Sequence, residues 1–138
     1  MYSGMSTQLP EPFQSWFSER RWRLYPHQQA MIDAARSGVH ALLIAPTGGG
    51  KTMAGFLPSL LELADRKLGA SAGTGGLHTL YISPLKALTV DVHRNLEWPI
   101  AEMSLAVVAE TRTGDTPQAK RQRQRLRPPV LMHAEYEL

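Results

Sequence analysis

The stretch of sequence that decides the fold is Ala45-Pro46-Thr47-Gly48-Gly49-Gly50-Lys51-Thr52. An apolar run, residues 40–44, comes directly before it, and residues 53–68 follow with apolar side chains at helical spacing. Strand, glycine-rich turn and helix in this order are the context of a phosphate-binding loop. Glycines lack a Cβ, so their N–H groups can curl around an anion at the positive end of the following helix. The stretch therefore predicts a nucleotide-binding site.

The last two residues of this stretch carry the chemistry that such a site needs. Lys51 offers a mobile positive charge to the β- and γ-phosphates, and the Thr52 hydroxyl can ligate Mg²⁺ held on the nucleotide. Lys51 and Thr52 are therefore the candidate catalytic residues, with Thr52 as the candidate metal contact through ATP. The alternative is an ordinary glycine-rich turn with an incidental lysine.

Length and composition bound the class of protein. The chain has 138 residues, of which 43% are hydrophobic and 20% charged, as in one average soluble domain. It has no cysteine, no apolar run long enough to span a bilayer and no secretory signal pattern, which favours a cytoplasmic protein without membrane contact. Its net charge of +3 is concentrated in residues 112–127, where six basic residues face one acidic residue.

The expected elements alternate between strand and helix. We expect strands at residues 40–45, 78–83 and 105–110 and from residue 130 onward. We expect helices from residue 13, at 26–37 and 51–67, from 84 until Trp98-Pro99, and from an N-cap at Thr116 to about 126. The inward face of the helix at 26–37 is expected to consist of Ala30, Met31, Ala34 and Ala35. Residues 1–12 read as a loose lead-in, and residues 69–76 as a flexible glycine-rich connection. This order predicts a parallel α/β sheet.

Two further loops follow expected strands and carry polar side chains. Residues 83–86 and 111–117 each combine hydroxyl groups, the N–H groups of a helix start and a basic residue, which suits a phosphodiester backbone. Parallel strands are expected to place these two loops and the glycine-rich loop at one edge of the sheet. Ordinary helix capping explains these residues equally well. The basic helix at 120–127 can attract phosphate nonspecifically or simply present a solvated face.

With these motifs in order, the chain resembles the start of a superfamily 2 DNA helicase of the Lhr-like group, and is most similar to ligase-associated DEXH-box helicases. The matching residues are Tyr25-Pro26-His27-Gln28, Leu42-Leu43-Ile44 with the glycine-rich stretch, Leu77 to Leu88 and Thr111-Arg112-Thr113-Gly114-Asp115-Thr116-Pro117. The resemblance implies a RecA-like P-loop sheet with flanking helices. Residues 13–138 would form an incomplete first part of helicase lobe 1.

The resemblance also implies roles for individual residues. Gln28 would read adenine; its amide matches the adenine edge, although a lone Gln at a helix start is usually a surface residue. The implied residues for ATP and Mg²⁺ are Gln28, Pro46, Thr47, Gly48, Gly49, Gly50, Lys51 and Thr52. The implied nucleic-acid contacts are Pro84, Leu85, Lys86, Thr113, Gly114 and Asp115.

The implied protein is an ATP-dependent DNA helicase or translocase of DNA repair, with DNA as partner, RNA not excluded, and a DNA ligase and nuclease as implied associates. The sequence departs from the family pattern at His133-Ala134-Glu135-Tyr136, where Thr-Thr-Pro-Glu is expected, and contains no Asp-Glu-x-His box. We therefore expect this chain to fold marginally and to bind ATP and DNA weakly, with negligible hydrolysis. Alternatives are a truncated, non-catalytic nucleic-acid-binding fragment and a P-loop ATPase acting on another substrate.

Overall fold

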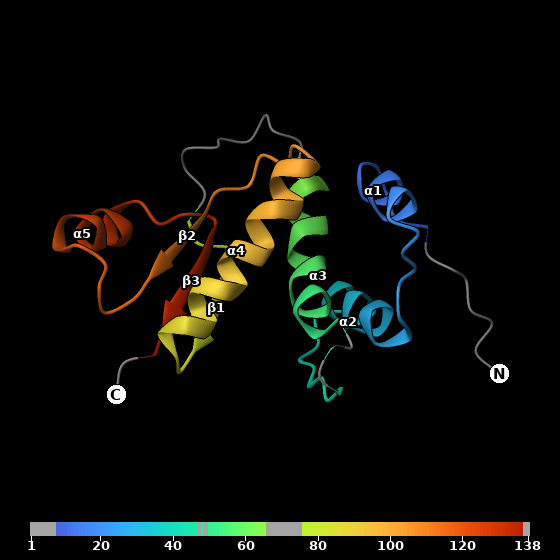
Figure 1. Ribbon diagram of the computed structural model, residues 1–138, viewed down its shortest axis with the longest axis horizontal. Helices are drawn as coiled ribbons and strands as arrows, with labels where there is room; N and C mark the ends of the chain where they lie inside the picture. The colour runs from blue at the N-terminus through green and yellow to red at the C-terminus, as the bar shows by residue number, and fades with distance from the viewer. Residues whose placement is uncertain (1–7, 47, 49, 66–75, 137–138) are drawn as a thin grey trace. The chain divides into compact units, whose positions relative to one another are not determined.

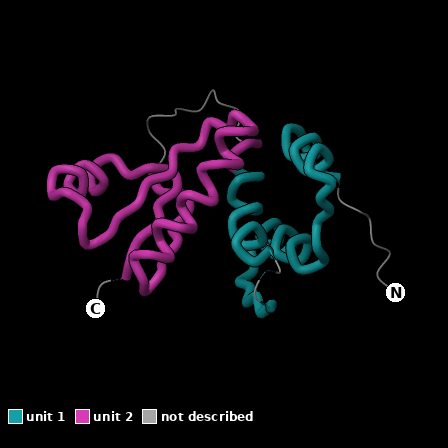
Figure 2. The backbone as a smooth tube through the Cα atoms, viewed as in Figure 1, with its two compact units in different colours: residues 1–62 teal, residues 63–138 magenta. Residues whose placement is uncertain are grey.

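The backbone divides into two units, residues 1–62 and 63–138 (Figure 2). The computed structural model describes residues 8–46, 48, 50–65 and 76–136. Most of the expected lead-in, residues 1–7, and most of the expected glycine-rich connection, residues 69–75, therefore lie outside the described residues. The first unit is built from helices and the second around a sheet (Figure 1).

The first unit contains α1 (Phe13–Glu19), α2 (Pro26–Arg36) and most of α3 (Lys51–Asp65). The aromatic residues Phe13, Trp16 and Phe17 are all buried, as their i, i+3, i+4 spacing predicts. Gly38 ends α2 with a positive φ of 68°, and its N–H donates to the carbonyl of Ala35 at 3.1 Å. Each of these helices therefore forms where its local sequence signals place it.

The buried faces of these helices differ in part from the expectation. On α2, we expected Ala30, Met31, Ala34 and Ala35 to face inward, whereas the buried residues are Gln28 and Ile32. On α3, the expected stripe is confirmed at Phe56, Leu57, Leu60 and Leu61. Pro58 lies inside α3 without ending it. The mistake on α2 arises because small alanines fit either face, so the larger Ile32 decides the orientation.

The strand expected at residues 40–45 is wrong: these residues form neither helix nor strand. Leu42 and Ile44 keep 86% and 85% of their surface exposed. A parallel strand exists only where a neighbouring strand takes up its backbone N–H and C=O groups. The pairing of the three described strands includes no residue of this segment, so its apolar run has no sheet to join.

The second unit is a parallel sheet of β1 (Thr79–Ser83), β2 (Ala109–Arg112) and β3 (Leu131–Glu135), in the spatial order β1-β3-β2 (Figure 1). The expected parallel α/β architecture is thereby confirmed. In the register, Ser83 lies opposite Glu135, and Arg112 lies opposite Ala134. The central strand β3 thus brings the carboxyl ends of all three strands to one edge.

Two helices complete this unit: α4 (Lys86–Glu102), which contacts all three strands, and α5 (Gln118–Leu126). The expected end of α4 at Trp98-Pro99 is wrong, because Pro99 lies inside the helix and is buried. Strand β2 begins four residues later and ends two residues later than the expected 105–110. Pairing with β3 sets its position, and the apolar Val107 packs before the strand begins.

Candidate functional site

The glycine-rich loop stands at the start of α3, within the first unit. Gly48 and Gly50 have φ values of 84° and 72°, a backbone conformation that residues other than glycine rarely adopt. Lys51 and Thr52 are the first two residues of α3 and are exposed, and its first turn has no acidic residue. Thr47 and Gly49 lie outside the described residues. The positive end of the helix, the exposed ammonium group and the hydroxyl group therefore share one place, as phosphate binding requires.

Gln28 joins α2 to this loop, although a glutamine at a helix start is usually a surface residue. Only 4% of its surface is exposed. Its Oε1 accepts a hydrogen bond from the Tyr25 N–H at 2.9 Å, and its Nε2 donates to the Gly50 carbonyl at 3.3 Å. A side-chain amide has two N–H donors and two acceptor lone pairs. Within the described residues, these two bonds use one of its N–H donors and one of its lone pairs.

A cavity of about 530 Å³ opens between this junction and the segment before α2. Gln28, Gly48, Gly50 and Met53 line one part of it; the rest is lined by Phe17, Arg21, Trp22, Arg23, Leu24 and Tyr25. Its volume is within the range of cavities that hold small ligands. Its lining combines glycine backbone, a side-chain amide, aromatic rings and two arginines. These groups can contact the phosphates and the base of a nucleotide.

Our sequence interpretation did not include Trp22 among the site residues. The Trp16 ring meets the Trp22 ring edge-on at 5.3 Å, and the Phe17 ring does so at 6.1 Å. The ring is therefore held by the buried side of α1 while about half of it stays exposed. The alternation of basic and aromatic residues at 20–25 is the signal that would have found it.

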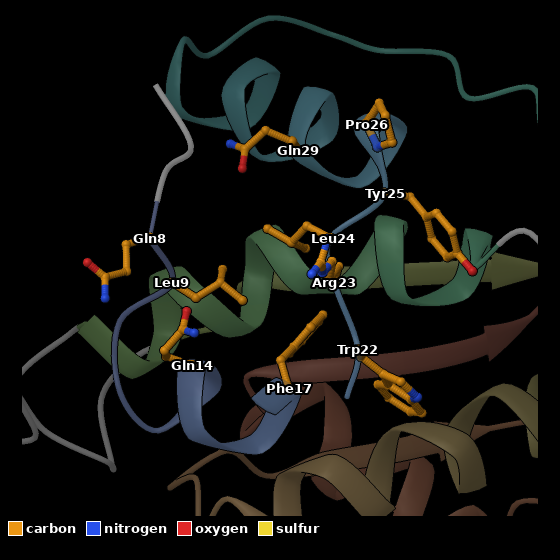
Figure 3. Close-up of a pocket in the computed structure, with 10 residues that line it drawn as sticks. All are labelled: Gln8, Leu9, Gln14, Phe17, Trp22, Arg23, Leu24, Tyr25, Pro26 and Gln29. Carbon is orange, nitrogen blue, oxygen red and sulfur yellow. The ribbon is translucent and has the colours of Figure 1, made fainter. Parts of the chain in front are cut away.

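A second cavity, of about 670 Å³, is lined by the same segment and by both neighbouring helices. Figure 3 shows Leu24 with Gln14 and Phe17 from α1 on one side and Gln29 from α2 on the other. Its lining has three glutamines and, among the described residues, none from the glycine-rich loop. The smaller cavity is therefore the candidate nucleotide site.

The two polar loops of the second unit meet at the carboxyl edge of the sheet. Lys86, at the start of α4, forms an ion pair with Asp115 in the loop after β2. Gly114 donates its N–H to the Glu135 carboxylate at the end of β3, at 3.0 Å. The sequence thus correctly predicted that these two loops share one edge, but it did not single out Glu135. The glycine-rich loop, which we expected at the same edge, belongs to the first unit and follows no described strand.

The backbone of the loop at residues 113–116 is more fully bonded than we expected. The Thr113 N–H donates to Thr116 Oγ1 at 2.9 Å, and the Asp115 N–H donates to Thr113 Oγ1 at 3.3 Å. The expected N-cap at Thr116 is wrong: α5 begins at Gln118, and the Thr116 hydroxyl closes the turn instead. This hydroxyl bonds within the loop because Pro117, with an extended ψ of 146°, delays the helix.

The loop at residues 83–86 is arranged differently. The buried Ser83 hydroxyl bonds the backbone of Leu85, donating to its carbonyl at 3.3 Å and accepting from its N–H at 3.4 Å. The N-cap residue of α4 makes no side-chain capping bond, and its first turn has no acidic residue. The positive end of a 17-residue helix therefore faces this edge beside Lys86.

Two of the residues that depart from the family pattern, His133 and Glu135, lie in different surroundings. His133 is fully buried on the central strand, where its ring meets those of His93 at 5.1 Å and Tyr81 at 5.8 Å. Burial, with a smaller contribution from His93, lowers the pKa of His133 to about 4, so it is neutral at pH 7. Glu135 accepts the Gly114 N–H, and the next residue, Tyr136, donates its N–H to the Ser83 carbonyl at 2.7 Å.

The described residues offer neither a cluster of metal ligands nor a membrane-spanning helix. No cluster of three or more His, Asp or Glu side chains suited to a metal ion occurs among them. Within the same residues, no helix combines the length and apolarity needed to cross a membrane. The candidate metal contact is therefore still the Thr52 hydroxyl beside bound phosphates.

Comparison with known proteins identifies the class to which this fold and site belong. Residues 25–135 match the family model of the DEAD/DEAH box helicases, which covers the glycine-rich loop, both polar loops and the sheet. The chain belongs to the DEAD/DEAH box helicase family.

The similar relatives narrow this placement. The chain is 37% identical over 127 residues to the Lhr helicase/probable uracil glycosylase of Mycolicibacterium smegmatis, covering 85% of this chain and 8% of the relative. It is 30% identical over 134 residues to the ATP-dependent helicase Lhr-Core of Methanocaldococcus jannaschii, covering 90% of this chain and 16% of the relative. The resemblance to Lhr-like helicases is thus confirmed, for a chain that spans under a fifth of these relatives.

Solved structures agree with this placement. The helicase Lhr of Mycobacterium smegmatis bound to ssDNA and AMP-PNP matches with a TM-score of 0.79 and 32% identity, over 94% of this chain and 17% of that one. The DUF1998 helicase MrfA bound to DNA and AMPPNP matches with a TM-score of 0.74 and 29% identity, over 95% and 17%. The first part of a RecA-like helicase lobe is therefore the correct description of the fold.

Proposed function

We propose that this chain is the ATP-binding and strand-binding part of an ATP-dependent DNA helicase. The junction of Gln28 with Gly50 carries this proposal, because it places a buried amide, a phosphate-type loop and a cavity of nucleotide size together. Two similar structures are described as bound to DNA and to AMP-PNP or AMPPNP.

Each loop residue has a role in this proposal. Gln28 reads the adenine edge between the aromatic walls, and residues 46–52 hold the triphosphate, with Lys51 on the β- and γ-phosphates. The Thr52 hydroxyl would help to hold Mg²⁺, and the ion would neutralise charge on the phosphates. Among the described residues, no carboxylate lines the cavity. We therefore expect this chain to bind ATP with negligible hydrolysis.

The edge of the sheet in the second unit is the proposed strand contact. Pro84, Leu85 and Lys86 would meet the phosphodiester backbone at the uncapped start of α4, and Thr113 and Gly114 would meet it from the neighbouring loop. A carboxylate repels phosphate, so Asp115 contributes by holding Lys86 in place. The contacts go to backbone atoms, which suits an enzyme that tracks along any sequence.

The finer assignment follows the family resemblance. We propose that the chain belongs to a ligase-associated DEXH-box helicase of DNA repair in the cytoplasm, with a DNA ligase and a nuclease as its associates. A co-purification experiment from the source cells with tagged chain, followed by mass spectrometry, tests the partners. Absence of both enzymes would count against this subtype and leave the helicase assignment untouched.

The nucleotide site is tested by titrating a fluorescent ATP analogue in the presence of Mg²⁺. Lys51→Ala should weaken binding at least about tenfold, since it removes the charge that meets the phosphates. Lys120→Ala, which removes a lysine of α5, is the matched control and should bind as the unmodified chain does. Equal losses in both variants would show a nonspecific charge effect and contradict the site.

The strand contact is tested with a labelled oligo-dT and an oligo-U of the same length, followed by fluorescence anisotropy over a range of salt concentrations. Lys86→Ala should weaken binding and lower the salt slope by about one. If the affinity for the strand is changed neither by ATP nor by Lys51→Ala, the chain is better described as a purely nucleic-acid-binding fragment. Normal ATP binding without strand binding would favour an ATPase with another substrate.

A further inference from the structure

One arginine ties down the loop after β2. Arg121 of α5 donates from Nη2 to the carbonyl of Thr113 at 2.7 Å and to that of Gly114 at 2.9 Å. Its Nε donates to the carbonyl of Thr116 at 3.0 Å. A guanidinium group offers five N–H donors in one rigid plane, so a single side chain can hold three carbonyls of one turn.

The helix that carries Arg121 is itself fastened to strand β2. The buried Gln124 donates from Nε2 to the carbonyl of Thr111 at 3.1 Å. Arg123 pairs with the Glu110 carboxylate. These contacts give one face of the basic helix a structural role that neither of our sequence interpretations included. Arg121 therefore extends from a fixed support to the loop.

Holding these carbonyls also fixes the direction of N–H groups. In a trans peptide, the C=O of one residue and the N–H of the next point in opposite directions. The Thr113 carbonyl points to Arg121, so the Gly114 N–H points away from it, toward Glu135. The same relation links the Gly114 carbonyl and the Asp115 N–H. One side chain therefore sets two N–H directions in the loop that contacts Lys86 through Asp115.

We propose that Arg121 is a positioning residue for nucleic-acid binding: it holds residues 113–116 in the conformation that meets the strand, and it does not itself contact phosphate. This inference rests on the proposed strand contact. It gives the residue a role that depends on the shape of its side chain, whereas a phosphate contact would depend mainly on its charge.

The test compares Arg121→Lys and Arg121→Gln with the control Arg125→Lys, an exposed position on the same helix. Labelled oligo-dT binding is measured over a range of salt concentrations, and amide hydrogen exchange is measured at Gly114 and Asp115. A lysine keeps the charge but cannot span three carbonyls. Both Arg121 variants should therefore weaken binding about tenfold with an unchanged salt slope and faster exchange, and the control should match the unmodified chain.

Three results would overturn the proposal. Normal binding by Arg121→Lys, with weakened binding and a salt slope lower by about one in Arg121→Gln, would show a direct phosphate contact. Normal binding by both would show that the loop needs no support. An unmodified chain that binds no strand would refute the proposed contact itself, and with it the role of Arg121 there.

A second variant guards against a loss of folding. Thr116→Val removes the hydroxyl that accepts the Thr113 N–H, and so loosens the same turn while leaving Arg121 intact. It should give the same weakened binding with an unchanged salt slope, and binding equal to that of the unmodified chain would contradict the proposal. Binding of the fluorescent ATP analogue to the first unit should be normal in every variant.

Discussion

The contact between Gln28 and Gly50 yields a sharp prediction about two neighbouring glycines. Gly48→Ala and Gly50→Ala both place an L-residue at positive φ, which costs about 1–2 kcal/mol. A Cβ at position 48 would meet no described atom within 4 Å, whereas at position 50 it would lie 2.7 Å from Gln28 Nε2. The second variant must therefore also displace a buried amide.

The extra cost of Gly50→Ala can be estimated from that displacement. It removes the hydrogen bond from Gln28 to the Gly50 carbonyl and leaves a buried amide poorly bonded, at about 1–3 kcal/mol. We expect Gly50→Ala to destabilise the first unit by about 2–4 kcal/mol, and Gly48→Ala by about 1–2 kcal/mol. Adding Gln28→Ala should cost less in the Gly50→Ala chain than in the unmodified chain, since the contact is already lost.

The assay is urea denaturation monitored by tryptophan fluorescence. A Trp98→Phe background removes the tryptophan of the second unit, so the signal reports on Trp16 and Trp22 alone. The fluorescent ATP analogue is then titrated into each variant. Equal destabilisation by the two alanines, or additive effects of Gln28→Ala and Gly50→Ala, would refute the reasoning.

Two further predictions concern stability. Burial lowers the pKa of His133 to about 4, so the unfolded chain binds a proton more readily than the folded chain does. The second unit should therefore keep its stability above pH 6.5. It should lose up to about 3 kcal/mol of that stability as the pH falls toward 4. His133→Leu should remove this pH dependence, and the exposed His40→Gln should keep it. The prediction is contradicted if the free energy of unfolding changes with pH by the same amount in the unmodified chain and in His133→Leu. Because Leu42 and Ile44 are exposed, replacing both by Ser should change stability by less than about 0.5 kcal/mol for each in denaturant titration, and a loss of several kcal/mol would show that they are buried.

Local sequence signals predicted the position of every described helix, though not each of its ends, and indicated the candidate nucleotide site. Pro26 and Gly38 bound α2, the glycine-rich stretch leads into α3, and Pro128-Pro129 follows α5. These signals act within a few residues, because a proline ring or a glycine φ constrains its own turn. The order of the motifs was also sufficient to indicate the family, which the comparisons then established.

Contacts between distant residues decided the rest. Residues 40–45 read as a strand, yet a strand forms only with a partner, and β2 took its position from β3 instead of from its own apolar residues. The burial of Gln28 against Gly50, 22 positions away, and the hold of Arg121 on the loop after β2 depend on side chains from separate elements. The sequence alone determined which chemical groups are present. The tertiary structure decided which of these groups bond within the protein and which face a ligand, because hydrogen-bond partners are fixed only in the folded chain.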